Sequence, residues 1–196
     1  METCERVVFL NGPGIYLRPP DESDLPHFVR WMNDPEVRIY LQNQTPMMLL
    51  AEKEWFGELP KRMKTDVILV LVDKTNDKPV GTFGVHGIDH RNGTATTGAC
   101  IGEKEYWSKG FGTRAKMLIL KHAFHTLNLR KIYSRVFDFN ERSQRYSKKC
   151  GYIEEAILKE DVFIDGSYHD LHFLSVYRTN WEPLWKKFLD SNSLPW

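Results

Sequence analysis

The sequence is poor in cysteine, in net charge and in long apolar stretches. Its three cysteines, Cys4, Cys100 and Cys150, are too few and too widely spaced for a disulfide framework. The 27 Lys and Arg residues nearly balance the 26 Asp and Glu residues, so the formal net charge is +1. This balance argues against a protein that coats nucleic acid or an anionic membrane, but it is compatible with a local basic pocket.

Targeting signals are equally scarce. No stretch approaches the roughly 20 consecutive apolar residues of a membrane span. The first residues, METCERVVFLNGPG, contain an early acidic residue and a short apolar run, which make a poor secretory signal. We therefore expect a cytoplasmic, reduced protein with neither a membrane nor nucleic acid among its partners.

The remaining composition is that of an ordinary globular chain. Of its 196 residues, 41% are hydrophobic and 27% are charged, and no repeat, low-complexity segment or long linker divides them. The sequence therefore predicts a single domain over residues 1–196, with a core at about 14–181 and a C-terminal helix at about 181–190.

Hydrophobic patterning and turn signals divide the chain into short strands and a few helices. The apolar run VILVLV at 67–72 is typical of a strand buried on both faces, and Asn92-Gly93 is a hairpin signal. The expected strands are 14–18, 67–72, 80–88, 94–102, 131–139, 152–164 and 168–177. The expected helices are 21–33, 46–60, 111–127, 140–150 and 181–189. This order favours an α/β (α+β) fold, in which a mixed sheet carries helices on both faces.

The most informative segment is a glycine-containing loop that leads directly into the expected helix 111–127. Its sequence is YWSKGFGT, residues 106–113. Glycines at a helix start let the backbone approach a ligand closely, and the free N–H groups there favour phosphate oxygens. Lys109 would add a positive charge. The alternative is an ordinary glycine turn before a helix.

Two other phosphate-binding loops fit this segment poorly. No window matches the Walker A pattern, in which Gly and Gly-Lys-Ser/Thr are separated by four residues. The run Gly110-x-Gly112-x-x-Ala115 matches a relaxed dinucleotide fingerprint, but no strand directly precedes its first glycine. Both a nucleotide triphosphatase and a dinucleotide-binding domain are therefore disfavoured.

Three stretches of the chain together resemble the GNAT superfamily of acyl-coenzyme A-dependent N-acetyltransferases, and most closely its ribosomal-protein alanine and serine acetyltransferase branch. They are YLRPPDESDLPHFVRWMNDPEV, IGEKEYWSKGFGTRA and NERSQRYSKKCGY. The loop in the second stretch is similar to the family's Arg/Gln-x-x-Gly-x-Gly/Ala motif, with Trp107 at its first position. The resemblance implies a mostly antiparallel sheet of about seven strands. It also implies that strands 94–102 and 131–139 splay into a V-shaped cofactor cleft.

The resemblance further implies acetyl-CoA as cosubstrate, with no metal. In the family, the backbone N–H groups of the loop hold the pyrophosphate, and pantetheine pairs with the first splayed strand. Asn140 and Ser143 match the family's Asn-x-x-Ser/Ala beside the pantetheine arm, although Asn140 is also a good N-cap. Arg142, Lys148 and Lys149 are candidates for the 3′-phosphate, or else solvated helix charges. The implied cofactor-binding residues are Ile101, Gly102, Ser108, Lys109, Gly110, Phe111, Gly112, Thr113, Asn140 and Ser143.

The implied chemistry is direct attack of a neutral primary amine on the acetyl thioester in a ternary complex. Many relatives place a Tyr in the helix after the Asn as the acid for the departing thiolate. Counting between Asn140 and Gly151 puts this position at Ser147, a much weaker acid, and leaves Tyr146 to pack. Ser147 is thus the candidate catalytic residue.

The general base is less clear, because Thr96 stands where relatives often carry a Glu. His86, Asp89 and His90 on the neighbouring hairpin are alternatives, each of which also fits a plain surface role. Proximity and positioning of the amine are expected to do most of the catalytic work.

The acceptor remains open at this point. The resemblance favours a protein N-terminus, and the alternatives are an amino sugar, an aminoglycoside, a polyamine, or a noncatalytic acyl-CoA sensor with no acceptor. The chain is expected to act as a monomer or homodimer. His122 and His125 could share one helix face, but no third metal ligand accompanies them, so they are expected to be solvated histidines.

Overall fold

A computed structural model describes residues 8–41, 43 and 45–192, and in this part of the chain eight strands form one sheet. The strands are β1 (Leu10–Gly12), β2 (Ile15–Arg18), β3 (Val67–Asp73), β4 (Lys78–Asp89), β5 (Thr94–Ile101), β6 (Lys131–Phe137), β7 (Ile153–Ile164) and β8 (Ser167–Tyr177). The helices are η1 (Glu22–Asp24), α1 (Leu25–Asn33), α2 (Pro35–Arg38), α3 (Leu49–Arg62), η2 (Lys104–Tyr106), α4 (Phe111–Lys121), the π-helical η3 (His122–Thr126), α5 (Glu141–Lys149) and α6 (Arg178–Asn192).

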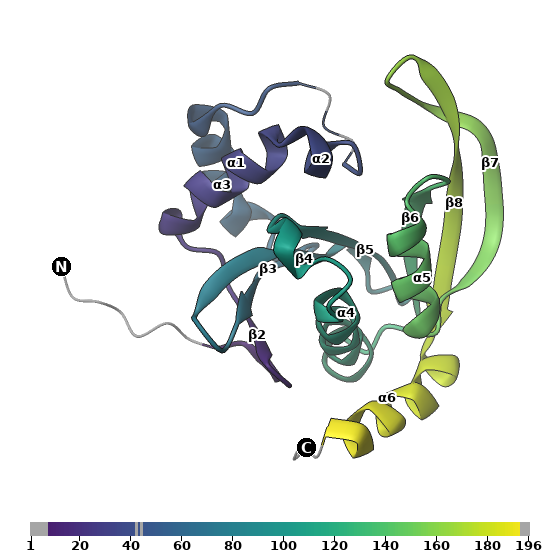
Figure 1. Ribbon diagram of the computed structural model, residues 1–196. Coiled ribbons are helices and arrows are strands. Elements are labelled where there is room, and N and C mark those ends of the chain that lie inside the picture. Colours follow the sequence, from purple (N-terminus) through teal and green to yellow (C-terminus); the bar gives the residue numbers. More distant parts are fainter. Residues whose placement is uncertain (1–7, 42, 44, 193–196) are drawn as a thin grey trace.

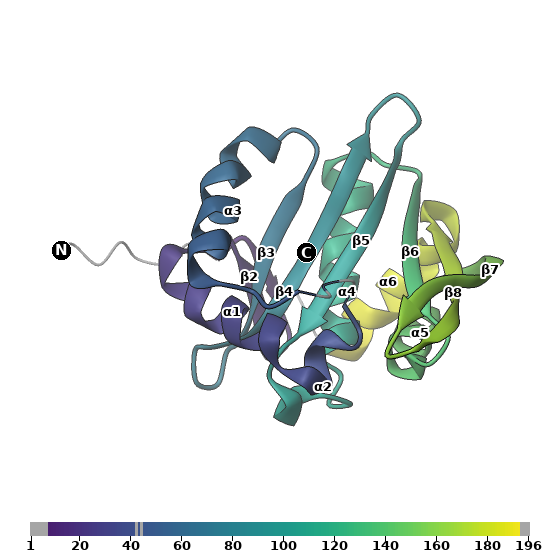
Figure 2. The same ribbon diagram turned by 90° about the horizontal axis from the view of Figure 1, so that it is seen from above.

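The sheet is mixed but mostly antiparallel, as predicted. Its strand order is β1-β2-β3-β4-β5-β6-β8-β7, and β5 with β6 is the one parallel pair among the described strands. The helices α1, α2 and α3 lie on one face and α4 lies on the other, seen from the side in Figure 1 and from above in Figure 2.

The parallel pair is short, and this opens the sheet at its centre. Only residues 94–96 of β5 pair with residues 131–133 of β6. Beyond Thr96, β5 continues to Ile101 and β6 continues to Phe137 without pairing to each other. The two strands therefore diverge, which confirms the predicted V.

Strand β3 explains why a continuous apolar run occurs at the centre of the chain. Leu69 and Leu71 belong to the core under α4, whereas Val70 and Val72 pack in the second core with α1. Because successive side chains on a strand point to opposite faces, a strand covered on both faces needs apolar residues at every position.

Several boundaries differ from the sequence-based expectation. The expected seven strands become eight, because Leu10–Gly12 folds back on β2 as a short edge strand before the turn at Gly14. The helix expected at 46–60 is α3, which contains Pro60 rather than ending at it. Pro35 ends α1 as expected, but it also begins α2, with the Asp34 side chain accepting a hydrogen bond from the Glu36 amide.

Other local predictions are confirmed. Asn140 is the N-cap of α5, and Gly151 follows that helix at φ +91°. The expected helix 111–127 is α4 continued by the π-helical turn η3. Helix α6 is longer than expected and buries Trp181 and Trp185. None of the helices that the structure describes is both long and apolar enough to cross a membrane.

Candidate functional site

The glycine loop forms the start of α4 and presents unused backbone donors. Gly110 is the N-cap at φ +80°, and Ser108 also has a positive φ of 60°. The first intrahelical hydrogen bond runs from the Arg114 amide to the Gly110 carbonyl. The preceding N–H groups of 111–113 therefore have no helical acceptor, and the positive end of the helix dipole adds to their attraction for an anion.

Arg114 holds this loop in place, a role that the sequence pattern did not indicate. Its guanidinium donates to the carbonyls of Pro13, Gly110 and Lys109 at 2.9, 3.4 and 3.3 Å. These three bonds tie the loop to the turn between β1 and β2. The amides are thus oriented before any ligand arrives.

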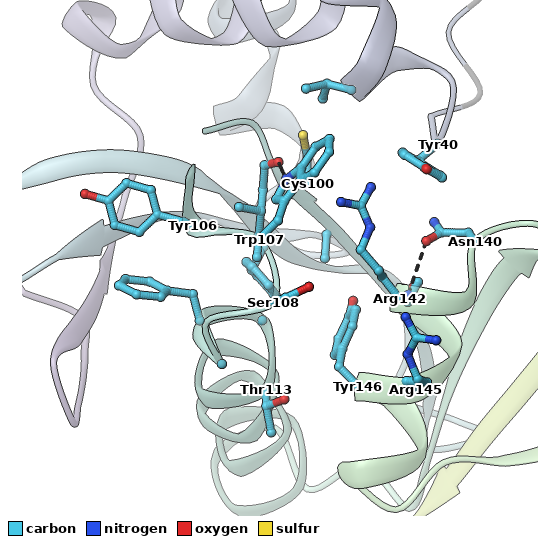
Figure 3. Close-up of a pocket in the computed structure, with 18 of the residues that line it drawn as sticks. Tyr40, Cys100, Tyr106, Trp107, Ser108, Thr113, Asn140, Arg142, Arg145 and Tyr146 are labelled. Carbon is cyan, nitrogen blue, oxygen red and sulfur yellow. Dashed lines mark hydrogen bonds between the residues drawn. The ribbon is translucent and has the colours of Figure 1, made fainter. Parts of the chain in front are cut away.

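A cavity of about 290 Å³ opens between this loop, the end of β5 and the start of α5 (Figure 3). The structure brings most of the predicted cofactor-binding residues to this cavity. Those that line it are Ile101, Ser108, Gly110, Phe111, Gly112, Thr113, Asn140 and Ser143. Asn140 accepts a hydrogen bond from the Ser143 amide at 3.2 Å, so it caps the helix as well as lining the cavity.

Two predicted residues do not line the cavity. Lys109 contributes its carbonyl to Arg114 and is absent from the lining. A Cβ at Gly102 would lie 2.0 Å from the Trp31 ring, so this glycine allows close packing of α1 instead. The Gly102 amide donates to Val80, and the Ile101 carbonyl accepts from the Trp107 indole at 2.7 Å.

Basic side chains from α5 face the same cavity. The Arg142 guanidinium stacks on the Trp107 ring, with its central carbon 3.6 Å from that ring's centre and 4.8 Å from the centre of the Tyr40 ring. Arg145 and Lys149 complete the cationic side of the lining. The sequence singled out Arg142 and Lys149 only as alternatives, and it missed Arg145 and Tyr40.

The two neighbouring hydroxyls of α5 are placed opposite to expectation. Ser147 is fully buried, lines neither described cavity, and its Oγ has no hydrogen-bond partner. Its catalytic role stays a prediction for which the geometry provides no access. Tyr146, expected to pack, lines the cofactor-side cavity, and its hydroxyl points into it (Figure 3). Adjacent helical residues differ by about 100° in direction, and packing of α5 decides which one faces the cavity.

A second cavity of about 400 Å³ lies where β5 and β6 diverge. It is lined by Tyr40, His86, Gly87, Thr96, Thr97, Arg135, Val136, Phe137, Asn140 and Leu171. Tyr40 and Asn140 line both cavities, so the two meet at these side chains. The V therefore joins two compartments.

His86 is the titratable base in this second compartment. Added Cβ atoms at Gly84 and Gly98 would lie 2.6 and 3.1 Å from its Nε2, so two glycines make room for the imidazole. Burial is the main cause that lowers the pKa of His86 below its usual value. The negative charge of Asp66 raises this pKa, and the positive charges of Arg62 and Lys116 lower it. The ring is therefore neutral at pH 7.

The other candidate bases lie outside both cavities. Asp89 accepts hydrogen bonds from Asn92 in the hairpin, which lower the pKa of its carboxyl, and His90 belongs to the same turn. Thr96, which stands where relatives carry a Glu, does line the second cavity.

The helix histidines are separate from the site. His122 is buried against Phe9 rather than solvated as predicted, and burial lowers its pKa. His125 bonds to Glu182 at 2.9 Å. No group of three His, Cys, Asp or Glu side chains arranged to hold a metal occurs among the residues that the structure describes.

A splayed parallel strand pair, a helix start with free backbone donors and a second cavity that shares lining residues with the first agree with the N-acyltransferase site that the resemblance implied. The model of the acetyltransferase (GNAT) domain matches residues 15–153, and the chain belongs to this family. It is therefore an acetyl-CoA-dependent N-acetyltransferase, as the resemblance predicted.

Known proteins agree with this assignment. The Probable N-acetyltransferase YjcK of Bacillus subtilis is 32% identical over 85% of this chain and 96% of its own length. The fold is similar to spermidine N-acetyltransferase from Vibrio cholerae in complex with CoA and spermine, with TM-score 0.79, 23% identity, and coverage of 86% and 98%. It is also similar to ribosomal-protein-S5-alanine acetyltransferase from Vibrio fischeri, with TM-score 0.77, 21% identity, and coverage of 89% and 98%.

The residues present fit coenzyme A. Phosphate groups would find loop amides and three cationic side chains in the first cavity. A Cβ at Gly112 would contact Ile101 and Tyr146 at 3.5 and 3.7 Å, so glycine keeps this cradle open. The edge of β5 beyond Thr96 has no strand partner on the β6 side, which suits pairing with the amides of a pantetheine arm.

Proposed function

We propose that the protein acetylates the free N-terminal amine of a peptide or protein. One observation carries the proposal. The described lining of the second cavity contains Arg135 and the neutral His86 and no carboxylate. The acceptor compartment is therefore suited to a substrate with one amine to present and with carbonyl or carboxylate oxygens nearby.

A polyamine fits this compartment poorly. Such a molecule carries several ammonium groups at pH 7, and their binding is favoured by a lining of complementary negative charge. Arg135 on β6 would repel each of them, since like charges without compensation oppose binding. The oxygens of a peptide backbone or side chain instead match the guanidinium donors.

The same cavity supplies the base that the reaction needs. The attacking amine must be neutral, and His86 can accept its proton because burial keeps the imidazole unprotonated. Backbone N–H groups at the free edge of β5 are suited to the thioester oxygen. On the cofactor side, Phe111, Gly112 and Thr113 would hold the pyrophosphate through their amides.

The test compares acceptors at fixed acetyl-CoA. We expect kcat/KM for peptides with free Ala or Ser termini to exceed that for spermidine by about tenfold or more, a difference of about 1.4 kcal/mol. The same peptides with blocked termini and one internal Lys should be poor acceptors, which separates the terminal amine from the side-chain amine.

A charge-reversal variant makes the test specific to the cavity. Arg135→Glu should lower kcat/KM for the peptides and raise it for spermidine, while Arg145→Glu, on the cofactor side, should lower both together. A preference for spermidine in the wild type, unaltered by Arg135→Glu, would contradict the proposal.

A further inference from the structure

Lys116 on α4 is an unusual residue, because its side chain is enclosed in the protein. Only 1% of its surface is exposed. The ammonium donates a hydrogen bond to Thr97 Oγ1 at 3.0 Å. It also lies 5.4 and 5.3 Å from the ring centres of Tyr146 and Tyr152. The charge is thus held by one hydroxyl and two aromatic rings.

No carboxylate neutralises this charge among the residues that the structure describes. Lys116 takes part in none of the ion pairs formed within residues 8–41, 43 and 45–192. The nearby thiol of Cys150 does not serve as an anion, because burial raises its pKa to about 12. Burying an unpaired ammonium is costly, and buried ionisable groups without a partner cluster at functional sites, where they meet a charge that binds or forms during the reaction.

Thr97 is a fixed contact point for the ammonium. Its Oγ1 also lies 2.8 Å from the Tyr152 hydroxyl and 3.2 Å from the Tyr133 carbonyl. A hydroxyl that accepts from Lys116 and Tyr152 and donates to the carbonyl has used all its hydrogen-bonding capacity. The Lys116 side chain is therefore held in one direction.

That direction is toward the apex of the V. Thr97 is the first residue of β5 beyond the last pair with β6, and it lines the acceptor-side cavity. Tyr146, which covers the ammonium from the other side, lines the cofactor-side cavity. Lys116 itself lines neither cavity, but it contacts one lining residue of each, so its charge acts on both compartments at short range without direct exposure to them. It also contributes to the lowered pKa of His86 in the acceptor compartment.

We propose that the buried ammonium of Lys116 stabilises the negative charge that forms on the sulfur of coenzyme A when the acetyl group leaves. The amine nitrogen forms a bond to the thioester carbon, and the carbon–sulfur bond breaks with its electron pair remaining on sulfur. His86 takes the ammonium proton that leaves the amine neutral before the attack, and the proton that the nitrogen loses on forming the amide goes to water. The thiolate leaves as an anion whose charge Lys116 balances, so no acid has to protonate it.

This role accounts for two features together. The position aligned with the family's Tyr acid is Ser147, which is buried away from the cavities. An unpaired cation stands at the V instead. The inference rests on acetyl transfer from acetyl-CoA and is independent of the acceptor proposed above.

The test measures the pKa of the CoA thiol in the binary complex, with no acceptor present. Thiolate absorbance in the ultraviolet is followed against pH for the CoA complex, and the titration of the complex with desulfo-CoA is subtracted. This subtraction removes the ionisation of the tyrosines and of the chain's own three cysteines, because these groups are present in both complexes. Burial also raises the pKa of Cys100 and Cys150 to about 12. We expect the bound thiol to titrate about 1 to 3 pH units below free CoA in the wild type.

Three variants locate the source of the shift. Lys116→Met should bring the thiol pKa back to that of free CoA while leaving affinity for desulfo-CoA unchanged within about twofold, and Lys116→Arg should keep part of the shift. Tyr146→Phe keeps the ring over the ammonium and removes the hydroxyl, so it should retain the shift. If the CoA thiol pKa is lowered in the Lys116→Met complex as much as in the wild type, Lys116 is not the responsible group. The same conclusion follows if Tyr146→Phe alone abolishes the lowering of the thiol pKa.

Folding does not obscure this result. Methionine fits the linear side chain and removes a buried charge, so Lys116→Met should unfold at the same or a higher denaturant concentration than the wild type. Thr97→Val offers a second route, because it removes the hydroxyl that directs the ammonium; a smaller thiol shift in this variant is expected, and an unchanged shift would count against the proposal.

Discussion

Substitution of Gly110 by Ala separates the two contributions of the glycine loop, backbone conformation and anion binding. Gly110 has φ +80°, and a Cβ placed there would meet no atom within 4 Å. The cost is therefore conformational rather than steric, about 1–2 kcal/mol for an L-residue in this region. Relief of that strain would turn the amides of 111–113 away from their present direction.

The effect on the cofactor can be worked from those amides. A hydrogen bond from a backbone N–H to a charged oxygen contributes about 1.5–3 kcal/mol. Loss of one such bond corresponds to roughly 10- to 100-fold weaker binding. We expect Gly110→Ala to raise the Kd for CoA by this factor in a calorimetric titration, and to lower the free energy of unfolding in urea by about 1–2 kcal/mol.

Gly166→Ala is the matched control. Gly166 in the β7–β8 turn has φ +83°, and its Cβ would likewise meet no atom within 4 Å. It should lose as much stability as Gly110→Ala and bind CoA like the wild type. Wild-type CoA affinity in Gly110→Ala, or an equal loss of affinity in both variants, would refute the assignment of the loop as the phosphate site.

Three further results are expected. In the wild type, the acidic limb of the pH profile of kcat/KM should have its midpoint below about 6.5. His86→Asn should lower kcat/KM by about 100-fold or more and abolish this limb, and a retained limb would mean that another group is the base. Ser147→Ala should reduce kcat by less than about tenfold and should not lower thermal stability, because it removes a buried hydroxyl without a partner; a loss of several hundredfold would restore Ser147 as the acid. Burial raises the pKa of the Glu103 carboxyl, but hydrogen bonds from Lys78, Trp31 and Arg30 outweigh it and lower this pKa to about 2. The ionised carboxyl should therefore contribute up to about 3 kcal/mol to the free energy of unfolding above pH 4.5, and this contribution is lost as the pH falls toward 2. Glu103→Gln should flatten urea stability across that range, and a slope like that of the wild type would disprove the assignment.

Local sequence signals predicted much of the fold and the anion-binding half of the site. The alternation rules, the Asn92-Gly93 turn and the caps at Asn140 and Gly151 act over a few neighbouring residues, so they can be recognised in a linear sequence. The loop at 108–113 belongs to the same class, because a helix start exposes its own amides whatever lies around it.

Other features depend on contacts between distant segments. Arg114 reaches Pro13 across 101 positions, and His86 enters a space that exists because Gly84 and Gly98 are adjacent in the sheet. Counting along α5 chose Ser147 over Tyr146, because counting cannot show which face of that helix the rest of the protein covers. The eighth strand was missed because three residues carry too little pattern to be recognised.

The sequence by itself thus determined the family and the mixed sheet, and it predicted an anion site made of backbone, since these follow from motifs and short-range periodicity. Only the tertiary structure decided where charge lies inside the protein. Lys116 reads as one more basic residue in a chain with a net charge of +1, yet packing of α4 under β5 buries it at the apex of the V. The environment of a charge changes its electrostatic energy far more than the residue type that carries it, and burial is a property of the assembled fold.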